Sequence, residues 1–264
     1  MDLSPVFEPF KPLQENIRKL ASWPLIADFE FLQQIQGKPL ASRSCKTIRF
    51  VPQVTSAQEF SHQYEPRIFL AGEIQTRSNN WHDFFNALVW MTFPKTKAVL
   101  NQIHYNEMQR ALQNVQKQRS LLRDAATLFD ESGVVVVSSQ RDLIALLKNH
   151  EWKQLFWEQR KAVLSSMCFF VFGHGLYEKA LNPYIGMTGK GIMIHVEETF
   201  FKQTISEQIV AVDSMLEPIW LREKLLSADL TPVPILGYPG WYSDNCYSTF
   251  YNNKQYFRSH PSKR

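Results

Sequence analysis

Several polar residues that could act together lie in one short stretch before and within an apolar segment. They are Arg77, Asn80, His82, Asp83 and Asn86. A histidine can exchange a proton near neutral pH, and a nearby carboxylate can fix its tautomer and raise its basicity. These residue types therefore indicate acid–base chemistry, with the arginine binding an anionic group. The alternative is structural, namely a capped helix with one buried hydrogen-bond network.

The element that must position these side chains is a helix that begins at Asn79 or Asn80. Either asparagine can be the N-cap, because its side-chain oxygen can accept a backbone N–H of the first turn. Asp83 then lies near the positive end of the helix dipole, and His82 and Asn86, four residues apart, share one face. His82 and Asp83 point about 100° apart on such a helix, so we expect them to address different partners.

A second polar group surrounds His174, in the sequence Gly173-His174-Gly175. Glu178 follows four residues later, and on a helix this spacing could place both side chains on one metal ion. The zinc pattern of two histidines four residues apart is missing, so the sequence leaves the metal open, and structural hydrogen bonding is the alternative. The two glycines permit close approach of another backbone or of a ligand.

A third polar group begins with Arg123-Asp124. Asp124 precedes an apolar segment and could orient a histidine. The following Asp130-Glu131-Ser132-Gly133 is typical of a solvated β-turn, with a hard cation held by oxygen ligands as the alternative. No cofactor motif accompanies these groups, because the glycine-rich stretch 186–191 lacks the spacing of a phosphate loop.

The predicted fold is α+β, a mostly helical single domain over residues 1–264 with a small mixed or antiparallel sheet. Strands are expected near Arg67–Gln75, Thr127–Val137 and Ile192–Val196, with a hairpin turn at Gly133. Pro94 should open one helix that runs from about Lys95 to Arg123. Pro218 should kink or split a helix over 206–226. The tail after residue 231 is expected to be irregular, with its aromatic residues packed onto the body.

Composition excludes several functional classes. A net charge of +4 over 264 residues is weak, and the basic residues of 95–123 scatter around a helix, so nucleic acid is not an expected partner. No apolar run reaches the roughly 18 residues that a membrane span requires. The three cysteines lie far apart and no signal peptide precedes the chain, so we expect a cytoplasmic protein.

Several blocks of this sequence resemble one known family. They include Tyr64-Glu65-x-Arg67, Thr76-Arg77-x-Asn79-Asn80-Trp81-His82-Asp83, Phe93-Pro94-x-Thr96-Lys97, Arg123-Asp124-Ala125, Phe172-Gly173-His174 and Tyr256-Phe257-Arg258. The chain is similar in these blocks to a bacterial family catalogued only as a domain of unknown function, number 3025. The resemblance implies one domain over about residues 10–258 whose polar blocks occur together. It implies no activity.

The leading hypothesis is an uncharacterised enzyme or small-ligand-binding protein with one polar pocket for an anionic substrate. Its catalytic residues would be His82, Asp83, Asp124 and His174, where a histidine transfers the proton and an aspartate orients it. Its substrate-binding residues would be Arg67, Arg77, Asn80, Asn86 and Arg123. The alternative is a non-enzymatic interaction module that uses the aromatic C-terminal tail and the helix over 95–123 as its partner surface.

Overall fold

The computed structural model describes residues 4–20, 23–35, 37, 39–54, 59–113, 120–222 and 225–259. Its centre is a four-stranded mixed sheet of order β4-β3-β5-β6. The strands are β3 (Gly133–Ser138), β4 (Met167–Val171), β5 (Thr188–His195) and β6 (Thr231–Pro234). β3 is antiparallel to β4 and parallel to β5, which in turn is antiparallel to β6. All six residues of β3 are buried, as expected for a valine-rich central strand covered on both faces.

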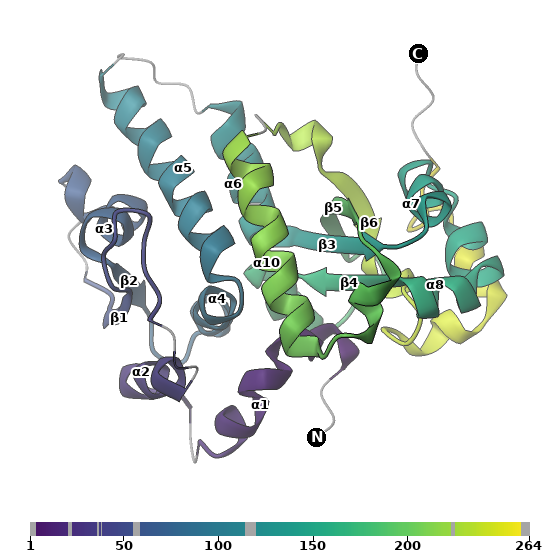
Figure 1. Ribbon diagram of the computed structural model, residues 1–264, viewed down its shortest axis with the longest axis horizontal. Coiled ribbons are helices and arrows are strands. Elements are labelled where there is room, and N and C mark those ends of the chain that lie inside the picture. The colour runs from purple at the N-terminus through teal and green to yellow at the C-terminus, as the bar shows by residue number, and fades with distance from the viewer. Residues whose placement is uncertain are drawn as a thin grey trace.

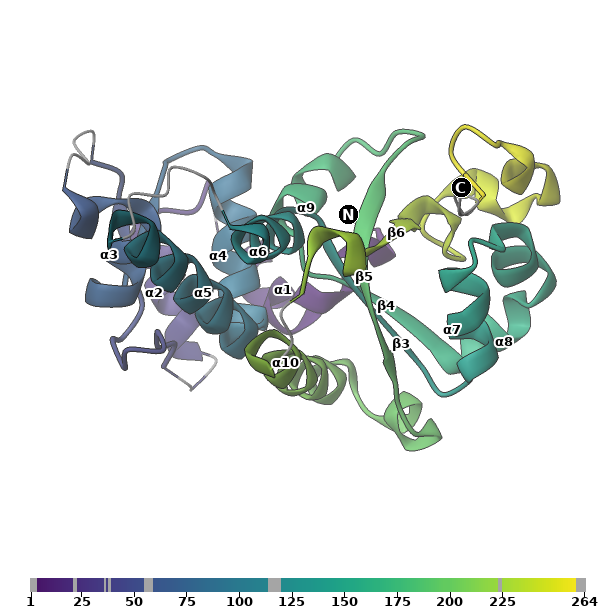
Figure 2. The same cartoon turned by 90° about the horizontal axis from the view of Figure 1, so that it is seen from above.

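Helices cover both faces of this sheet. Figure 2 shows α6 (Leu121–Ser132), α9 (His174–Ala180) and α10 (Ile205–Arg222) on one side and α7 (Arg141–Lys148) and α8 (Arg160–Ser166) on the other. Both α6 and α7 contact β3 and β5. The C-terminal segment lies beside α7 and α8 and contains the 3₁₀ turns Ile235–Gly237, Ser243–Cys246 and Ser248–Asn252.

The first half of the chain forms a helical part next to the sheet (Figure 1). After a 3₁₀ turn at Pro5–Phe10 it contains α1 (Lys11–Arg18), α2 (Ile26–Ile35), α3 (Tyr64–Ala71), α4 (Trp81–Thr92) and α5 (Pro94–Gln113). A separate two-stranded parallel sheet joins β1 (Arg49–Pro52) to β2 (Glu73–Thr76). α4 contacts both α5 and α9, so it connects the helical part to the element that carries His174. The mostly helical α+β class is therefore confirmed.

The ends of α4 and α5 show why the sequence folds as it does here. Asn80 caps α4, its Oδ1 accepting the backbone N–H of Asp83 at 3.0 Å, as predicted. Pro94 is the first residue of α5, where its missing N–H removes no helical hydrogen bond. Asp213 of α10 accepts the next two backbone N–H groups, those of Lys95 and Thr96, at 3.0 and 2.9 Å. A buried carboxylate thus fixes α10 against the start of α5.

Four predictions about secondary structure were wrong. Arg67 lies in α3 and not in a strand, and the strand predicted from Thr127 begins only at Gly133, with no hairpin turn there. Residues 127–132 are helical because Ser120 caps α6, its hydroxyl accepting the N–H of Arg123, and because Phe129 and two alanines bury one helical face. The helix predicted over 95–123 is interrupted: α5 ends at Gln113, α6 begins at Leu121, and 114–119 lie outside the described residues. For Pro218 the sequence left a kink or a split open, and α10 continues through it as one helix, so the split does not occur.

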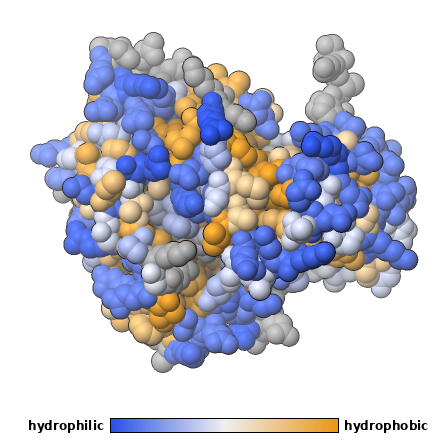
Figure 3. Space-filling model, viewed as in Figure 1, coloured by the Kyte–Doolittle hydropathy of each residue, from blue (hydrophilic) through white to orange (hydrophobic). Residues whose placement is uncertain are grey.

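The surface bears on the alternative hypothesis. On the face drawn in Figure 3, hydrophobic residues lie in bands between hydrophilic ones. The tail residues Trp241, Tyr251, Tyr256 and Phe257 are buried, so these rings stabilise the fold and do not form an exposed aromatic surface.

Among the described helices, none combines the length and the apolar character needed to cross a membrane.

Candidate metal centre

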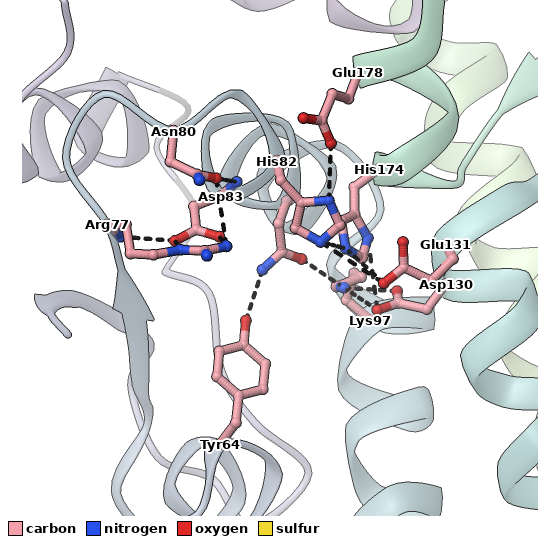
Figure 4. A network of polar contacts seen from close by, with 11 residues as sticks. Tyr64, Arg77, Asn80, His82, Asp83, Lys97, Asp130, Glu131, His174 and Glu178 are labelled. Carbon is pink, nitrogen blue, oxygen red and sulfur yellow. Dashed lines mark hydrogen bonds and ion pairs between the residues drawn. The ribbon is translucent and has the colours of Figure 1, made fainter. Parts of the chain in front are cut away.

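Two histidines from distant parts of the chain meet where α4 packs against α9. His82 lies in the first turn of α4 and His174 is the first residue of α9. Their Nε2 atoms are 3.0 Å apart, across 92 residues of sequence. The rings are almost perpendicular, with an interplanar angle of 73°. Each imidazole therefore directs the same ring nitrogen at one shared point (Figure 4).

A carboxylate from the last turn of α6 reaches the same point. Glu131 Oε1 lies 3.7 Å from His82 Nε2 and 3.5 Å from His174 Nε2. Ligand atoms bound tetrahedrally at 2.0–2.2 Å are separated from one another by about 3.2–3.6 Å. The three separations of 3.0, 3.5 and 3.7 Å are close to that range. His82, Glu131 and His174 therefore have the atom types and spacing of a three-ligand divalent metal site.

The other ring nitrogens face carboxylates. His82 Nδ1 lies 3.1 Å from Glu178 Oε2, and His174 Nδ1 lies 3.7 Å from Asp130 Oδ2. A carboxylate beside Nδ1 favours the proton on that nitrogen, which leaves an unshared electron pair on Nε2. Two such electron pairs only 3.0 Å apart repel each other unless a cation lies between them. A proton on one Nε2 also removes this repulsion: in the opposite tautomer, His174 Nε2–H donates to His82 Nε2, but the bare Nδ1 of His174 then faces Asp130.

Burial keeps His174 in the neutral state that binds metals, and Lys97 keeps Asp130 ionised. His174 is 5% exposed, and burial lowers its pKa to about 3, so the imidazole is neutral at pH 7. Burial also raises the pKa of Asp130, but the charge of Lys97 and its hydrogen bonds lower this pKa by more, and the net shift is downward. Asp130 is therefore an anion behind a neutral imidazole, which is the usual partner of a metal-binding histidine.

A buried chain of hydrogen bonds runs from Asp130 to Tyr64. Lys97 Nζ donates to both oxygens of Asp130, at 2.6 and 2.9 Å, and to Asn86 Oδ1 at 2.8 Å. Asn86 Nδ2 donates to the Tyr64 hydroxyl at 2.7 Å. The ammonium group also lies over the Trp90 ring, and Lys97 is 4% exposed. A buried charge of this kind requires its anionic partner, so the chain is fixed in place.

The glycines beside His174 permit the close approach predicted for them. A Cβ on Gly173 would lie 2.5 Å from the backbone of Ser132, and a Cβ on Gly175 would lie 2.5 Å from Glu131 Oε2. These two glycines therefore let the end of α6 pack directly against the start of α9. That contact is what brings Glu131 to His174.

The three candidate ligands line one pocket of about 330 Å³. Other polar residues lining it are Tyr64, Glu65, Arg77, Asp83, Asn86, His104, Arg123, Thr127 and Asp130. Six of the predicted site residues line this pocket, namely Arg77, His82, Asp83, Asn86, Arg123 and His174.

The other three predicted site residues are not among those lining the pocket. Arg67 pairs with Glu73, its Nε 2.8 Å from Oε2, Asn80 caps α4, and Asp124 lies in the first turn of α6.

Asp83 does not orient His82. It accepts two side-chain hydrogen bonds from Arg77, at 2.9 and 2.8 Å. Burial raises the pKa of Asp83, but these bonds lower it below its ordinary value. The carboxylate beside His82 is Glu178, which the sequence pattern had paired with His174.

Sequence reasoning missed Glu131, Asp130, Lys97 and Tyr64. The two acidic residues fall in the segment that the sequence predicts to be a solvated turn. A usable signal exists: if 121–132 is treated as helical, Arg123, Thr127 and Glu131 are spaced four apart and share one face.

Neither the curated proteins nor the solved structures contain a match to this chain. A family model, however, matches residues 48–261, which include every ligand of the candidate metal centre. The chain belongs to the family described as Protein of unknown function (DUF3025).

Proposed function

We propose that this protein is a metal-dependent enzyme that holds a divalent ion at His82, His174 and Glu131 and acts on a small anionic substrate. The observation that carries the proposal is the convergence of three ligand atoms, with both Nδ1 atoms turned to carboxylates. An ion held by three protein ligands keeps a position open, where it supplies Lewis acidity and lowers the pKa of a water molecule. Hydrolysis is the reaction class that this chemistry favours.

The remaining pocket residues support an anionic substrate. Arg77 and Arg123 both line the pocket, and guanidinium groups bind carboxylate and phosphate oxygens in pairs. Arg77 is fixed by Asp83, with 49% of its side chain exposed. Its position is therefore set before a ligand arrives, which lowers the entropy lost on binding.

The types of ligand atom limit which metal the site would bind. Two imidazoles and one carboxylate suit zinc, iron and other first-row divalent ions better than calcium or magnesium, which prefer oxygen ligands. We therefore expect zinc or a similar ion in purified protein.

Metal analysis tests the first half of the proposal. Purified wild type should contain about one equivalent of a first-row divalent ion, and the variant His82→Ala/His174→Ala should contain almost none. His195→Ala is the matched control, because His195 is an exposed histidine on β5. Full metal content in the double variant, or none in wild type after reconstitution, would overturn the metal site.

Activity assays test the second half. The zinc-reconstituted protein should hydrolyse one class of anionic chromogenic ester among phosphate and carboxylate substrates. His82→Ala/His174→Ala should lose this activity, and His195→Ala should retain it. Turnover that is equal in the double variant would refute catalysis at this site.

The interaction-module alternative has weaker support. Four aromatic residues of the tail, Trp241, Tyr251, Tyr256 and Phe257, are buried, and residues 95–123 do not form one helix. A cytoplasmic location remains part of our proposal, supported by the fact that Cys45, Cys168 and Cys246 are all free thiols.

A further inference from the structure

Lys97 determines which way the amide of Asn86 faces. An ammonium group can only donate hydrogen bonds, and Lys97 Nζ lies 2.8 Å from Asn86 Oδ1. The amide oxygen must therefore point at Lys97, and the amide nitrogen must point the other way. This orientation is stable because Lys97 is buried and bound to both oxygens of Asp130.

The fixed amide in turn determines the role of the Tyr64 hydroxyl. Asn86 Nδ2 lies 2.7 Å from Tyr64 Oη, and an amide nitrogen can only donate. The phenol oxygen is therefore the acceptor in this bond, and its own proton is not used there. Within the described residues this is the only hydrogen bond of the phenol.

The unused proton belongs to a residue of the pocket. Tyr64 lines the same pocket as His82, Glu131 and His174, and Figure 4 shows its ring rising from α3 with its hydroxyl in the hydrogen-bond network. A phenol that accepts one hydrogen bond becomes a stronger donor in a second, because the bonds polarise one another. The Tyr64 hydroxyl on α3 is thus a hydrogen-bond donor of the pocket that is already oriented and is not a candidate metal ligand.

We propose that Tyr64 is a catalytic residue whose phenol donates a hydrogen bond to an oxygen of an oxyanion substrate. The substrate would present one oxygen to the metal and a second to Tyr64, a requirement that phosphate and carboxylate groups both meet. Tyr64 would stabilise negative charge that develops on the second oxygen, as donors in oxyanion holes do. The oxyanion substrate rests on the proposed function, whereas the direction of the hydrogen-bond chain does not depend on a metal.

Inorganic phosphate is the probe that tests this role. Binding to zinc-reconstituted wild type is measured by titration calorimetry beside Tyr64→Phe, with Tyr184→Phe as the matched control, because Tyr184 is exposed and does not line the pocket. Tyr64→Phe should bind phosphate about 10-fold more weakly, as expected when one hydrogen bond to a charged group is lost. Its zinc content and the affinity of Tyr184→Phe should be unchanged.

A second variant tests the direction of the hydrogen bonds. In Asn86→Asp the new carboxylate can still accept from Lys97, but it now accepts the phenol proton as well. That proton turns away from the pocket and the added charge repels the anion, so Asn86→Asp should weaken phosphate binding at least as much as Tyr64→Phe. Adding Tyr64→Phe to Asn86→Asp should therefore weaken binding almost no further. Additive losses would show that the two residues act separately and would overturn the inferred chain.

The outcomes separate this inference from the metal proposal. Normal zinc content with equal phosphate affinity in wild type and Tyr64→Phe, or no phosphate binding by wild type, overturns the role of Tyr64 and leaves the metal site intact. Weaker binding in Tyr64→Phe from a protein that holds no metal overturns the metal site and supports Tyr64. In an active protein, Tyr64→Phe should lower kcat about 100-fold while metal content stays constant.

Discussion

Glu178 determines how His82 presents its ring to the shared point. Its Oε2 lies 3.1 Å from His82 Nδ1, so the proton stays on Nδ1 and the unshared pair of Nε2 faces Glu131 and His174. The partner of His174 is Asp130, which Lys97 holds in place. The two histidines thus have separate carboxylates, and each can be changed without removing a metal ligand.

Glu178→Gln should weaken metal binding without abolishing it. The amide can still accept a hydrogen bond from Nδ1 but carries no negative charge, so His82 becomes a poorer electron donor. Losing such a partner typically lowers metal affinity about 10–100-fold. Competition with a zinc-binding dye measures this change, and Glu198→Gln on an exposed residue is the control. Equal affinity in Glu178→Gln and wild type would show that Glu178 has no such role.

At the scale of elements, the site is a junction of three helix ends. The first turn of α4 supplies His82, the last turn of α6 supplies Glu131, and the first residue of α9 supplies His174. Both α6 and α4 contact α9. Because α9 is the shared neighbour, its two glycines control how closely the ligands approach one another.

Gly175→Ala should weaken metal binding without lowering the stability of the fold. The added Cβ would lie 2.5 Å from Glu131 Oε2 and 3.1 Å from the Glu131 carbonyl oxygen. The carboxylate ends a flexible side chain and can move aside, and the backbone contact needs a shift of only about a few tenths of an ångström. Alanine also favours a helix over glycine by roughly 1 kcal/mol, so the thermal midpoint should hold or rise while zinc affinity falls at least about 10-fold.

Gly173→Ala provides the contrast. Its Cβ would lie 2.5 Å from backbone atoms of Ser132, which cannot move without shifting α6, so this variant should lose stability. Normal zinc affinity in Gly175→Ala would mean that Glu131 is not a ligand.

The same elements show what the sequence can and cannot predict. The start of α4 follows from local chemistry, because an asparagine cap and a first-turn aspartate act within a few residues of each other. The end of α6 does not, since Asp130-Glu131-Ser132-Gly133 has the composition of a turn. Burial of Phe129 and the contacts of α6 with β3 and β5 keep the helix intact to Ser132. Tertiary packing therefore overrides the turn composition of this stretch, and the helix that results carries Glu131 to the two histidines.

At the scale of the whole molecule, polar groups that are distant in the sequence converge, as the sequence hypothesis required. The residues that meet are not all the ones that were predicted. His82 and His174 meet directly. From the third group, Arg123 lines the pocket and Glu131 reaches the histidines, whereas Asp124 is not among the lining residues. The four-stranded sheet makes this arrangement, because α6 leads into β3 and α9 follows β4, the neighbour of β3. A spacing pattern within one segment cannot predict this, because it does not say which strands are neighbours in the sheet.

Buried phenols hold the C-terminal segment together and join it to Met187, the residue before β5. Tyr256 Oη donates to the Met187 carbonyl at 2.7 Å and accepts the Leu236 N–H at 3.0 Å. Tyr251 Oη donates to the Gly237 carbonyl at 3.0 Å. Burial raises the pKa of Tyr251 to about 12 and raises the pKa of Tyr256 as well. The folded chain therefore keeps phenol protons that the unfolded chain releases near pH 10.

This difference predicts a loss of stability in alkali. Because the folded pKa values lie above the unfolded ones, the stabilisation is fully present below pH 10 and is lost as pH rises toward the folded values. Urea unfolding between pH 8 and 11.5 should show the free energy of unfolding of wild type falling above pH 10. Tyr256→Phe should be less stable at pH 8 by about 1–3 kcal/mol, because the Leu236 N–H loses its partner. Above pH 10 the free energy of unfolding of Tyr256→Phe should fall less than that of wild type, because the variant has one buried phenol fewer. Tyr247→Phe, at an exposed phenol of the same segment, should follow wild type throughout, and a Tyr256→Phe curve parallel to wild type would refute this linkage.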